Sequence, residues 1–192
     1  YLEEGPYAGR PAYDDVIQGG SGIAGAFLAR DGVPAYVPSV VADKSAGLIA
    51  ANGLTAALFQ RLRTGRGVYM EIGMFESMVA YTLVEHQFGL TFSPPKGQAG
   101  YTRVISDERK PYQTEDGYIC ILPYTDKQWQ SFWALADTPE LADDPRYLTM
   151  TERTRNVDAL YAQSRSAILK RTTAHWLKVL TDAEIPCGPI NT

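Results

Sequence analysis

Asp43 is the residue of this sequence whose type and surroundings most directly suggest chemistry. It stands in VADKSAGLIAANG, residues 41–53, between an apolar run and a stretch of small, unreactive residues. One interpretation makes it a helix N-cap, because an aspartate side chain accepts hydrogen bonds from the N–H groups of a first helical turn. The other makes it a nucleophile, because the positive end of a helix dipole stabilises an ionised carboxylate that can attack an activated acyl group. The local residues favour the cap and leave both interpretations open.

The element that would position Asp43 is a helix over residues 44–63. Leu54, Leu58 and Leu62 recur every four residues, as on one face of a helix, and the first glycine of RTGRG provides a stop. Small residues follow Asp43 and allow close approach to the backbone. They are Ala46, Gly47, Ala50, Ala51 and Gly53. A nucleophile at position 43 would therefore have room for a bulky thioester.

A second polar group precedes the first apolar run, in PAYDDVIQ at residues 11–18. Tyr13, Asp14 and Gln18 form either a solvated loop anchored by the tyrosine or part of a binding site. GGSG at residues 19–22 resembles a phosphate cradle but lacks the GxGxxG or GxxxxGK spacing. The residues alone do not decide between these interpretations.

Two further segments are candidates for binding a substrate or covering a site. KGQAG at residues 96–100 contains Gly97, Gln98 and Gly100, and is either a flexible connection or a lid. Asp126 opens an expected helix, and N-capping accounts for it adequately. His86 and His175 lie within helical patterns and are better explained as partly buried helix residues than as bases or metal ligands.

Composition and charge exclude several classes of partner. The 192 residues are 45% hydrophobic and 21% charged, as in a soluble folded protein. A net charge of -4, without a block of Lys and Arg, argues against binding to nucleic acid or an anionic membrane. Two distant cysteines and two histidines predict neither a disulfide framework nor a metal site, so we expect a reducing cytoplasm. We expect no membrane helix and no export signal.

The order of patterns along the chain predicts two domains. Residues 16–90 alternate between strand and helix signals, with a strand at 67–72, which predicts an α/β fold with a parallel sheet. Residues 91–104 are a linker or loop, and KPYQTEDGYICIL at 110–122 is a hairpin. Helices follow at 126–136, 152–170 and 174–183, the last two capped by Thr151 and Thr173, before an extended end. A chain that starts without Met and ends in PCGPINT is expected to be a piece of a longer protein.

Five blocks, in their order, resemble the family III CoA-transferases, which include formyl-CoA transferase, carnitine-CoA transferases and α-methylacyl-CoA racemase. They are GPYAGRPAYDDVIQGGSG, VADKSAGLIAANGLTAALFQRLRTGRG, GMFESM, KPYQTEDGYI and IPCGPINT. The resemblance implies a partial Rossmann-like large domain at residues 1–90, a 91–104 linker, a small α+β domain at 105–183, and a return to the large domain at 184–192. It also implies a homodimer whose full-length subunits interlock as linked rings.

The resemblance further implies a role for each matching residue. Asp43 would attack an acyl-CoA thioester to form an aspartyl acyl anhydride and then an aspartyl-CoA thioester, from which CoA passes to a small carboxylic acid. The segment of Pro11, Ala12, Tyr13 and Asp14 would contact coenzyme A, without any metal. Gln18, Asp126 and the glycines of the 96–100 loop would contact substrate or close over it, since both anhydrides hydrolyse in water.

Tyr13 distinguishes this sequence from the racemase branch of the same family. A histidine stands at this position in that branch and acts with the aspartate as an acid–base pair. A tyrosine phenol titrates near pH 10 in model peptides, which suits proton shuttling at neutral pH poorly. CoA transfer is therefore preferred over racemisation, and a non-catalytic CoA-binding fragment in which Asp43 only caps a helix is the third alternative.

Overall fold

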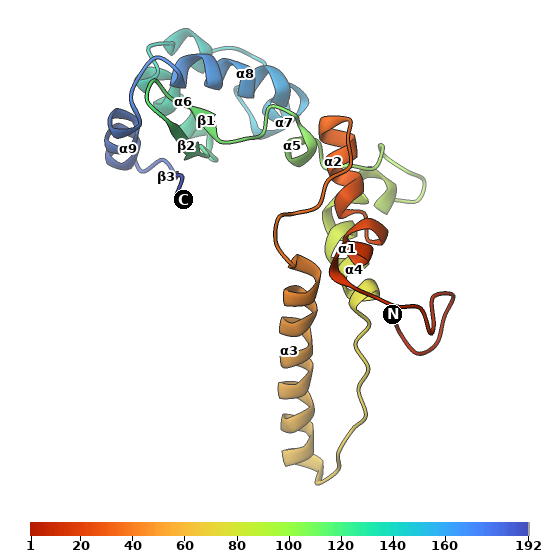
Figure 1. Cartoon of the computed structure of the whole chain (residues 1–192). Helices are drawn as coiled ribbons and strands as arrows, with labels where there is room; N and C mark the ends of the chain where they lie inside the picture. The colour runs from red at the N-terminus through yellow and green to blue at the C-terminus, as the bar shows by residue number, and fades with distance from the viewer. Residues whose placement is uncertain (192) are drawn as a thin grey trace. The chain divides into compact units, whose positions relative to one another are not determined.

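The computed structural model describes residues 1–191, and these form two compact units. The first unit is Tyr1–Tyr101 and the second begins at Thr102, so the division falls inside the segment 91–104. Figure 1 labels the α-helices and β-strands of both. The assignment of residues 184–192 to the first domain stays a prediction. In the described part of the chain, the strand at residues 187–189 pairs with residues 119–121 of the second unit.

Helices make up the regular structure of the first unit. They are α1 (Asp14–Gly20), α2 (Ile23–Asp31), α3 (Val41–Thr64), α4 (Met74–His86) and the 3-10 helix η1 (Phe88–Thr91). The predicted long helix is confirmed as α3, and Gly65 ends it in the left-handed region at φ 72°, where glycine carries no steric penalty. The local sequence was sufficient to place that end.

The strand expected at residues 67–72 is wrong for the part of the chain that the structure describes. The segment is extended and runs beside α3, but pairs with no strand among residues 1–191 (Figure 1). It crosses α3 at Gly53, where an added Cβ would lie 2.6 Å from Met70 Sδ and 3.2 Å from Ile72 Cδ1. An alternating pattern becomes a strand only when a neighbour satisfies its backbone N–H and C=O groups.

A small core joins three helices of the first unit at the start of α3. Ile17 of α1, Ala42 of α3 and Met78 of α4 are fully buried and pack together. Farther along α3, Leu54, Leu58 and Leu62 are exposed, although their spacing predicted the apolar face of a helix. The end of α3 that packs into this core is therefore its N-terminal turn, which contains Asp43.

The second unit combines a small sheet with helices. Its strands are β1 (Tyr112–Gln113), β2 (Tyr118–Ile121) and β3 (Cys187–Pro189), in the antiparallel order β1-β2-β3. The register pairs Tyr112 with Ile119, which confirms the predicted hairpin, and Ile119 with Pro189. The helices are α5 (Thr102–Ile105), α6 (Asp126–Leu135), η2 (Pro139–Ala142), α7 (Met150–Arg155), α8 (Val157–Ile168) and α9 (Thr173–Asp182).

An aromatic core holds the second unit together. Phe132 and Trp133 of α6 and Trp176 of α9 are almost wholly buried, with Ile119 of β2 in the same cluster. The Trp176 indole N–H donates to the carbonyl of Ile168 at 2.8 Å, so this buried polar group is satisfied. One buried face of the hairpin thus packs on three helices.

Two predicted helix starts in the second unit are wrong by one or two residues. The predicted helix 152–170 is two helices, α7 and α8, separated at Asn156, and its cap is Thr149 rather than Thr151. The cap of α9 is Thr172 rather than Thr173. In both places two threonines lie close together, and the one with extended backbone accepts the N–H of the first turn.

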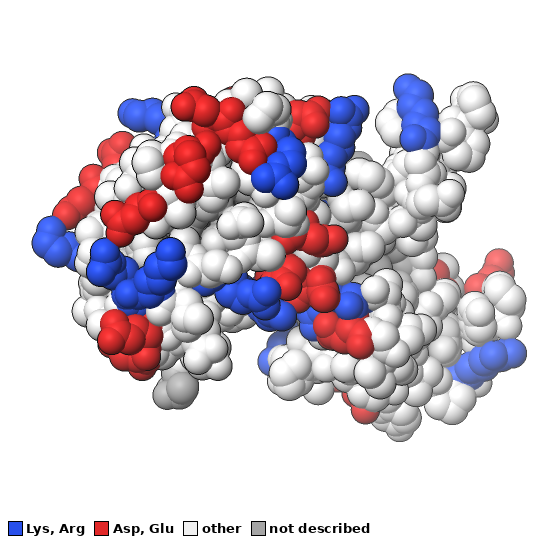
Figure 2. Space-filling view, turned by 90° about the horizontal axis from the view of Figure 1, so that it is seen from above, with Lys and Arg blue, Asp and Glu red and all other residues white. Residues whose placement is uncertain are grey.

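Charged side chains of both signs are interspersed over the face seen in Figure 2. That face shows no large area of Lys and Arg alone, as expected from the net charge of -4. Among residues 1–191, no helix is long and apolar enough to cross a membrane.

Candidate active site at the start of helix α3

Asp43 lies in the first turn of α3 and does not cap it. The helix begins at Val41 after the N-cap position Val40, so Asp43 is the third helical residue and its side chain is exposed. The N-cap residue stands before the first helical residue, and no hydrogen bond from the first turn of α3 reaches the Asp43 carboxylate. The expectation that Asp43 caps the helix is therefore wrong, and the non-catalytic alternative loses the role it gave to this carboxylate.

The side chain that caps α3 comes from α1. Asp14 Oδ1 accepts the backbone N–H of Ala42 at 2.7 Å and that of Asp43 at 3.1 Å. Asp14 is only 6% exposed, so it satisfies in a dry environment two donors that a helix start otherwise leaves unpaired. An aspartate 28 residues before Ala42 thus performs the function that the local sequence assigned to Asp43.

Gln18 completes this polar cluster. It lies one turn after Asp14 on α1, is 1% exposed, and its side-chain amide donates to Asp14 Oδ2. The Gln18 Oε1 atom accepts the N–H of Val37 at 2.9 Å, and its amide also approaches the carbonyl of Ser39 at 3.4 Å. The pair therefore binds both the segment before α3 and the first turn of α3.

The environment of Asp14 keeps its carboxylate ionised. Burial disfavours the charged form, but the hydrogen bond from Gln18 and those from the N–H groups of Asp43 and Ala42 outweigh it. The positive charge of Lys44 adds to them, and the pKa of Asp14 lies below its ordinary value. A negative charge is thus fixed at the N-terminus of α3, where the helix dipole favours it.

The rest of the proposed CoA-contacting segment is accessible. Pro11 is exposed, Ala12 is half-buried against the small core, and Tyr13 is 75% exposed. Asp14 differs from these neighbours, because its carboxylate points into the protein and is already hydrogen-bonded. Any contact of the segment 11–14 with a ligand would use the residues before Asp14 or the backbone of Asp14, and not its carboxylate.

Space for a ligand is present beside Asp43. Gly47, one turn further along α3, is exposed, and a Cβ added there would meet nothing within 4 Å. Lys44 Nζ donates to Ser39 Oγ at 2.8 Å. Among residues 1–191 the carboxylate of Asp43 accepts no hydrogen bond, so it remains available to an incoming group.

The loop 96–100 is hydrogen-bonded to the end of α4 and to η1. The N–H of Lys96 donates to the carbonyl of Gly89 at 3.0 Å, and Gly89 N–H donates to the carbonyl of Gln98 at 3.2 Å. Gly100 N–H donates to the carbonyl of His86 at 2.7 Å. Gly97 and Gln98 are exposed, whereas Gly89 is buried directly against the backbone of Gly97. The loop has a fixed base and an exposed surface.

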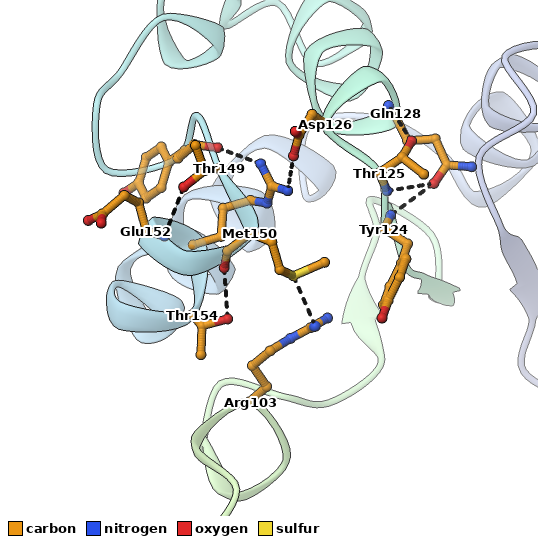
Figure 3. A network of polar contacts seen from close by, with 11 residues as sticks. Arg103, Tyr124, Thr125, Asp126, Gln128, Thr149, Met150, Glu152 and Thr154 are labelled. Carbon is orange, nitrogen blue, oxygen red and sulfur yellow. Dashed lines mark hydrogen bonds and ion pairs between the residues drawn. The ribbon is translucent and has the colours of Figure 1, made fainter. Parts of the chain in front are cut away.

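Asp126 belongs to the second unit, where its carboxylate pairs with an arginine. Thr125 caps α6 in a capping box with Gln128, so the expected cap at Asp126 is wrong by one residue. Asp126, labelled in Figure 3, instead forms an ion pair with the buried Arg153, which also donates to the carbonyl of Tyr147 at 2.8 Å. The carboxylate neutralises a guanidinium that burial would otherwise disfavour.

Among residues 1–191, no group of three or more His, Cys, Asp or Glu side chains is arranged to hold a metal ion. The cluster that the structure does assemble is Asp14, Gln18 and the first turn of α3. The spacing of four between Asp14 and Gln18 is typical of a helix. Because the interpretations of residues 11–18 were a solvated loop or part of a binding site, the sequence analysis missed the hydrogen bond between these two side chains.

Comparison with known proteins places these features in a family. A family model described as CoA-transferase family III matches residues 1–192. An acetyl-CoA:oxalate CoA-transferase of Acetobacter aceti is 33% identical over 98% of this chain and 49% of its own length. A succinyl-CoA:glutarate CoA-transferase of Mus musculus is 29% identical over 100% of this chain and 44% of its own. The chain thus spans about half the length of these relatives.

A solved structure shows the same fold. The orthorhombic crystal structure of Rv3272 from Mycobacterium tuberculosis aligns with all of this chain and 50% of that one. The TM-score is 0.80 at 25% sequence identity. The fold of this chain is therefore known from experiment.

Proposed function

Because this chain belongs to CoA-transferase family III, we propose that the protein of which it is part transfers coenzyme A from an acyl-CoA to a small carboxylic acid. The observation that carries the proposal is Asp43, an exposed carboxylate in the first turn of a helix whose cap is supplied by another residue. The named relatives act on acyl-CoA donors and carboxylic acids, which supports this class of reaction.

The proposed reaction begins when a carboxylate oxygen of Asp43 attacks the thioester carbonyl of the donor. The C–S bond breaks, CoA leaves as a thiolate, and a mixed anhydride joins Asp43 to the donor acyl group. The thiolate then attacks the Asp43 carbonyl, which releases the donor as a free carboxylate and leaves an Asp43–CoA thioester. No net proton transfer is needed in either step.

The second half of the proposed reaction repeats these steps with the acceptor. The acceptor carboxylate attacks the Asp43–CoA thioester, expels the thiolate and forms a second anhydride. The thiolate attacks the acceptor carbonyl of this anhydride, which gives the new acyl-CoA and regenerates the Asp43 carboxylate. Because both anhydrides react with water, we propose that the loop containing Gly97, Gln98 and Gly100 covers the site during turnover.

We propose that the exposed Pro11 and Tyr13, with Ala12 between them and the backbone of Asp14, form part of the coenzyme A contact. Part of a Rossmann-like large domain and an interlocked homodimer are proposed on the family resemblance. The cysteines, Cys120 and Cys187, are both unpaired, which supports a reducing compartment such as the cytoplasm. Tyr13 in place of a histidine supports transfer over racemisation.

The proposal is tested by trapping the intermediate on the complete gene product. Acyl-CoA is added, hydroxylamine converts any activated aspartyl group to a hydroxamate, and trypsin releases the peptide from Asp31 to Lys44. Fragment ions must place the modification on Asp43. Asp31→Asn, which removes the other carboxylate of this peptide, is the matched control and should leave the adduct unchanged.

Asp43→Ala and Asp43→Asn should each abolish turnover and the adduct. Undiminished turnover in either variant would show that Asp43 is not the nucleophile. Deuterium incorporation at the substrate α-carbon without CoA transfer would point to the racemase reaction instead.

A further inference from the structure

We propose that Asp14 and Gln18 are positioning residues for the reaction, which hold the first turn of α3 so that the Asp43 carboxylate faces the incoming acyl group. This inference rests on the proposed function, since it assigns Asp43 the role of nucleophile. It gives the side chain of Asp14 a role different from a direct contact with coenzyme A.

The first argument is the way in which the backbone of Asp43 is held. One oxygen of Asp14 accepts both the Ala42 and the Asp43 N–H groups, at 2.7 and 3.1 Å, while the other accepts the Gln18 amide. Every oxygen of this carboxylate is thus used within the protein. The peptide N–H of Asp43 itself donates to Asp14. A movement of Asp14 would therefore move the backbone that carries the nucleophile.

The second argument is that Gln18 fixes the approach to the helix. Its side chain accepts the N–H of Val37 and lies near the carbonyl of Ser39, at 2.9 and 3.4 Å. The segment 37–43 is therefore bound to α1 at its beginning through Gln18 and at its end through Asp14. Both side chains are more than nine-tenths buried, so water competes weakly for these bonds.

The third argument concerns the hydrogen bonds that Asp43 does not make. The carboxylate of an aspartate in the first turn of a helix can bend back and accept the N–H groups left unpaired there. The N–H groups of Ala42 and Asp43 already donate to Asp14. With these donors taken, the Asp43 carboxylate stays in the exposed orientation, where it accepts no hydrogen bond from residues 1–191.

Asp14→Asn in the complete gene product is the principal test. The asparagine oxygen can still accept the Ala42 and Asp43 N–H groups, but its amide would face the Gln18 amide, donor against donor. The measured quantity is the single-turnover rate at which acyl-CoA forms the hydroxylamine-trapped adduct on Asp43, at saturating substrate. We expect this rate to fall about 10- to 100-fold, as for a nucleophile displaced by about 1 Å.

The dissociation constant for CoA should stay unchanged in Asp14→Asn, because the exposed Pro11 and Tyr13 are retained. Asp15→Asn removes the same charge from the adjacent, exposed residue of α1 and should match the wild type. A purely structural role predicts a different pattern, in which the number of active sites falls but each remaining site reacts at the wild-type rate. An unchanged adduct rate per active site would overturn the inference.

The double variant Asp14→Asn with Gln18→Glu tests the hydrogen-bond assignment. Its glutamate can accept the asparagine amide and still accept the N–H of Val37, so the contact of donor with donor is removed. The weaker bond from the Gln18 amide to the Ser39 carbonyl, at 3.4 Å, is lost. We expect most of the lost rate to return, and a double variant as slow as Asp14→Asn alone would count against the assignment. If Asp14→Asn fails to fold, Gln18→Met keeps the cap and should slow the adduct step alone, and a wild-type rate there would overturn the inference.

The two levels of hypothesis fail in different ways. If wild-type enzyme forms no adduct on Asp43, the proposed function is wrong whatever Asp14 does. If wild-type enzyme forms the adduct and Asp14→Asn forms it equally fast per site, the proposed function stands and the positioning role is wrong.

Discussion

Replacing Gly89 should loosen the loop that we propose to cover the active site, whereas replacing Gly97 should not. A Cβ on Gly89 would lie 2.4, 2.5 and 2.6 Å from the Cα, C and N atoms of Gly97. Carbon atoms in contact prefer about 3.5 to 4.0 Å, so one backbone would have to move by about 1 Å. A Cβ on Gly97 would lie 3.6 Å from the Cα of Gly89, an ordinary contact.

The cost of Gly89→Ala follows from the hydrogen bonds at this contact. A shift of about 1 Å would break the bonds from Lys96 N–H to the Gly89 carbonyl and from Gly89 N–H to the Gln98 carbonyl, now 3.0 and 3.2 Å. Each is worth about 1 kcal/mol net, so closing the loop should lose about 2 kcal/mol. At 1.4 kcal/mol per tenfold, this corresponds to about 30-fold more frequent opening.

Hydrogen exchange is the direct assay, since the amides of residues 89 and 96 are the donors. Both should exchange about 30-fold faster in Gly89→Ala, while Gly97→Ala should match the wild type or exchange more slowly. If the loop shields the anhydrides, Gly89→Ala should also hydrolyse acyl-CoA faster in the absence of an acceptor. Equal exchange in the two alanine variants would refute the steric argument, and unchanged hydrolysis with faster exchange would refute only the covering role.

Two further predictions test the core and the electrostatics. Phe132 is 1% exposed and lies among the rings of Trp129, Trp133 and Trp176. Phe132→Ala should lower the free energy of unfolding by about 3 to 5 kcal/mol, measured by denaturant unfolding. A loss below about 1 kcal/mol would contradict the packing. Because the pKa of Asp14 is lower in the folded state, its stabilisation is complete above the unfolded pKa of about 3.9 and is lost as the pH falls through the folded value. Asp14→Asn should therefore unfold with a weaker dependence on pH below about 4 than wild type, and identical acid profiles would contradict the assigned charge.

The sequence predicted those features of the fold that depend on neighbouring residues. The end of α3 at Gly65 follows from the freedom of glycine to adopt a positive φ and is confirmed. The hairpin follows from two alternating runs joined by a turn and is confirmed, although Gly117 does not adopt a positive φ. The strand at 67–72 was wrong because alternation cannot reveal whether a pairing partner exists within residues 1–191. The predicted caps of two helices were wrong by one or two residues, because a second threonine lies close by and the local sequence does not show which of the two caps the helix.

The candidate site shows the same limit more sharply. From the residues, Asp43 had two competing roles, cap or nucleophile, and a single carboxylate had to serve one or both. In the structure the cap comes from Asp14, a residue 29 positions earlier, through a bond to the Asp43 N–H itself. No local pattern around Asp43 contains that information, since it depends on α1 packing against α3 through Ile17 and Ala42. Because Asp14 accepts the N–H groups at the helix start, the exposed carboxylate of Asp43 is not needed to cap the helix. A carboxylate without a structural duty, held in place by its own backbone, is what a reaction through covalent aspartyl intermediates requires.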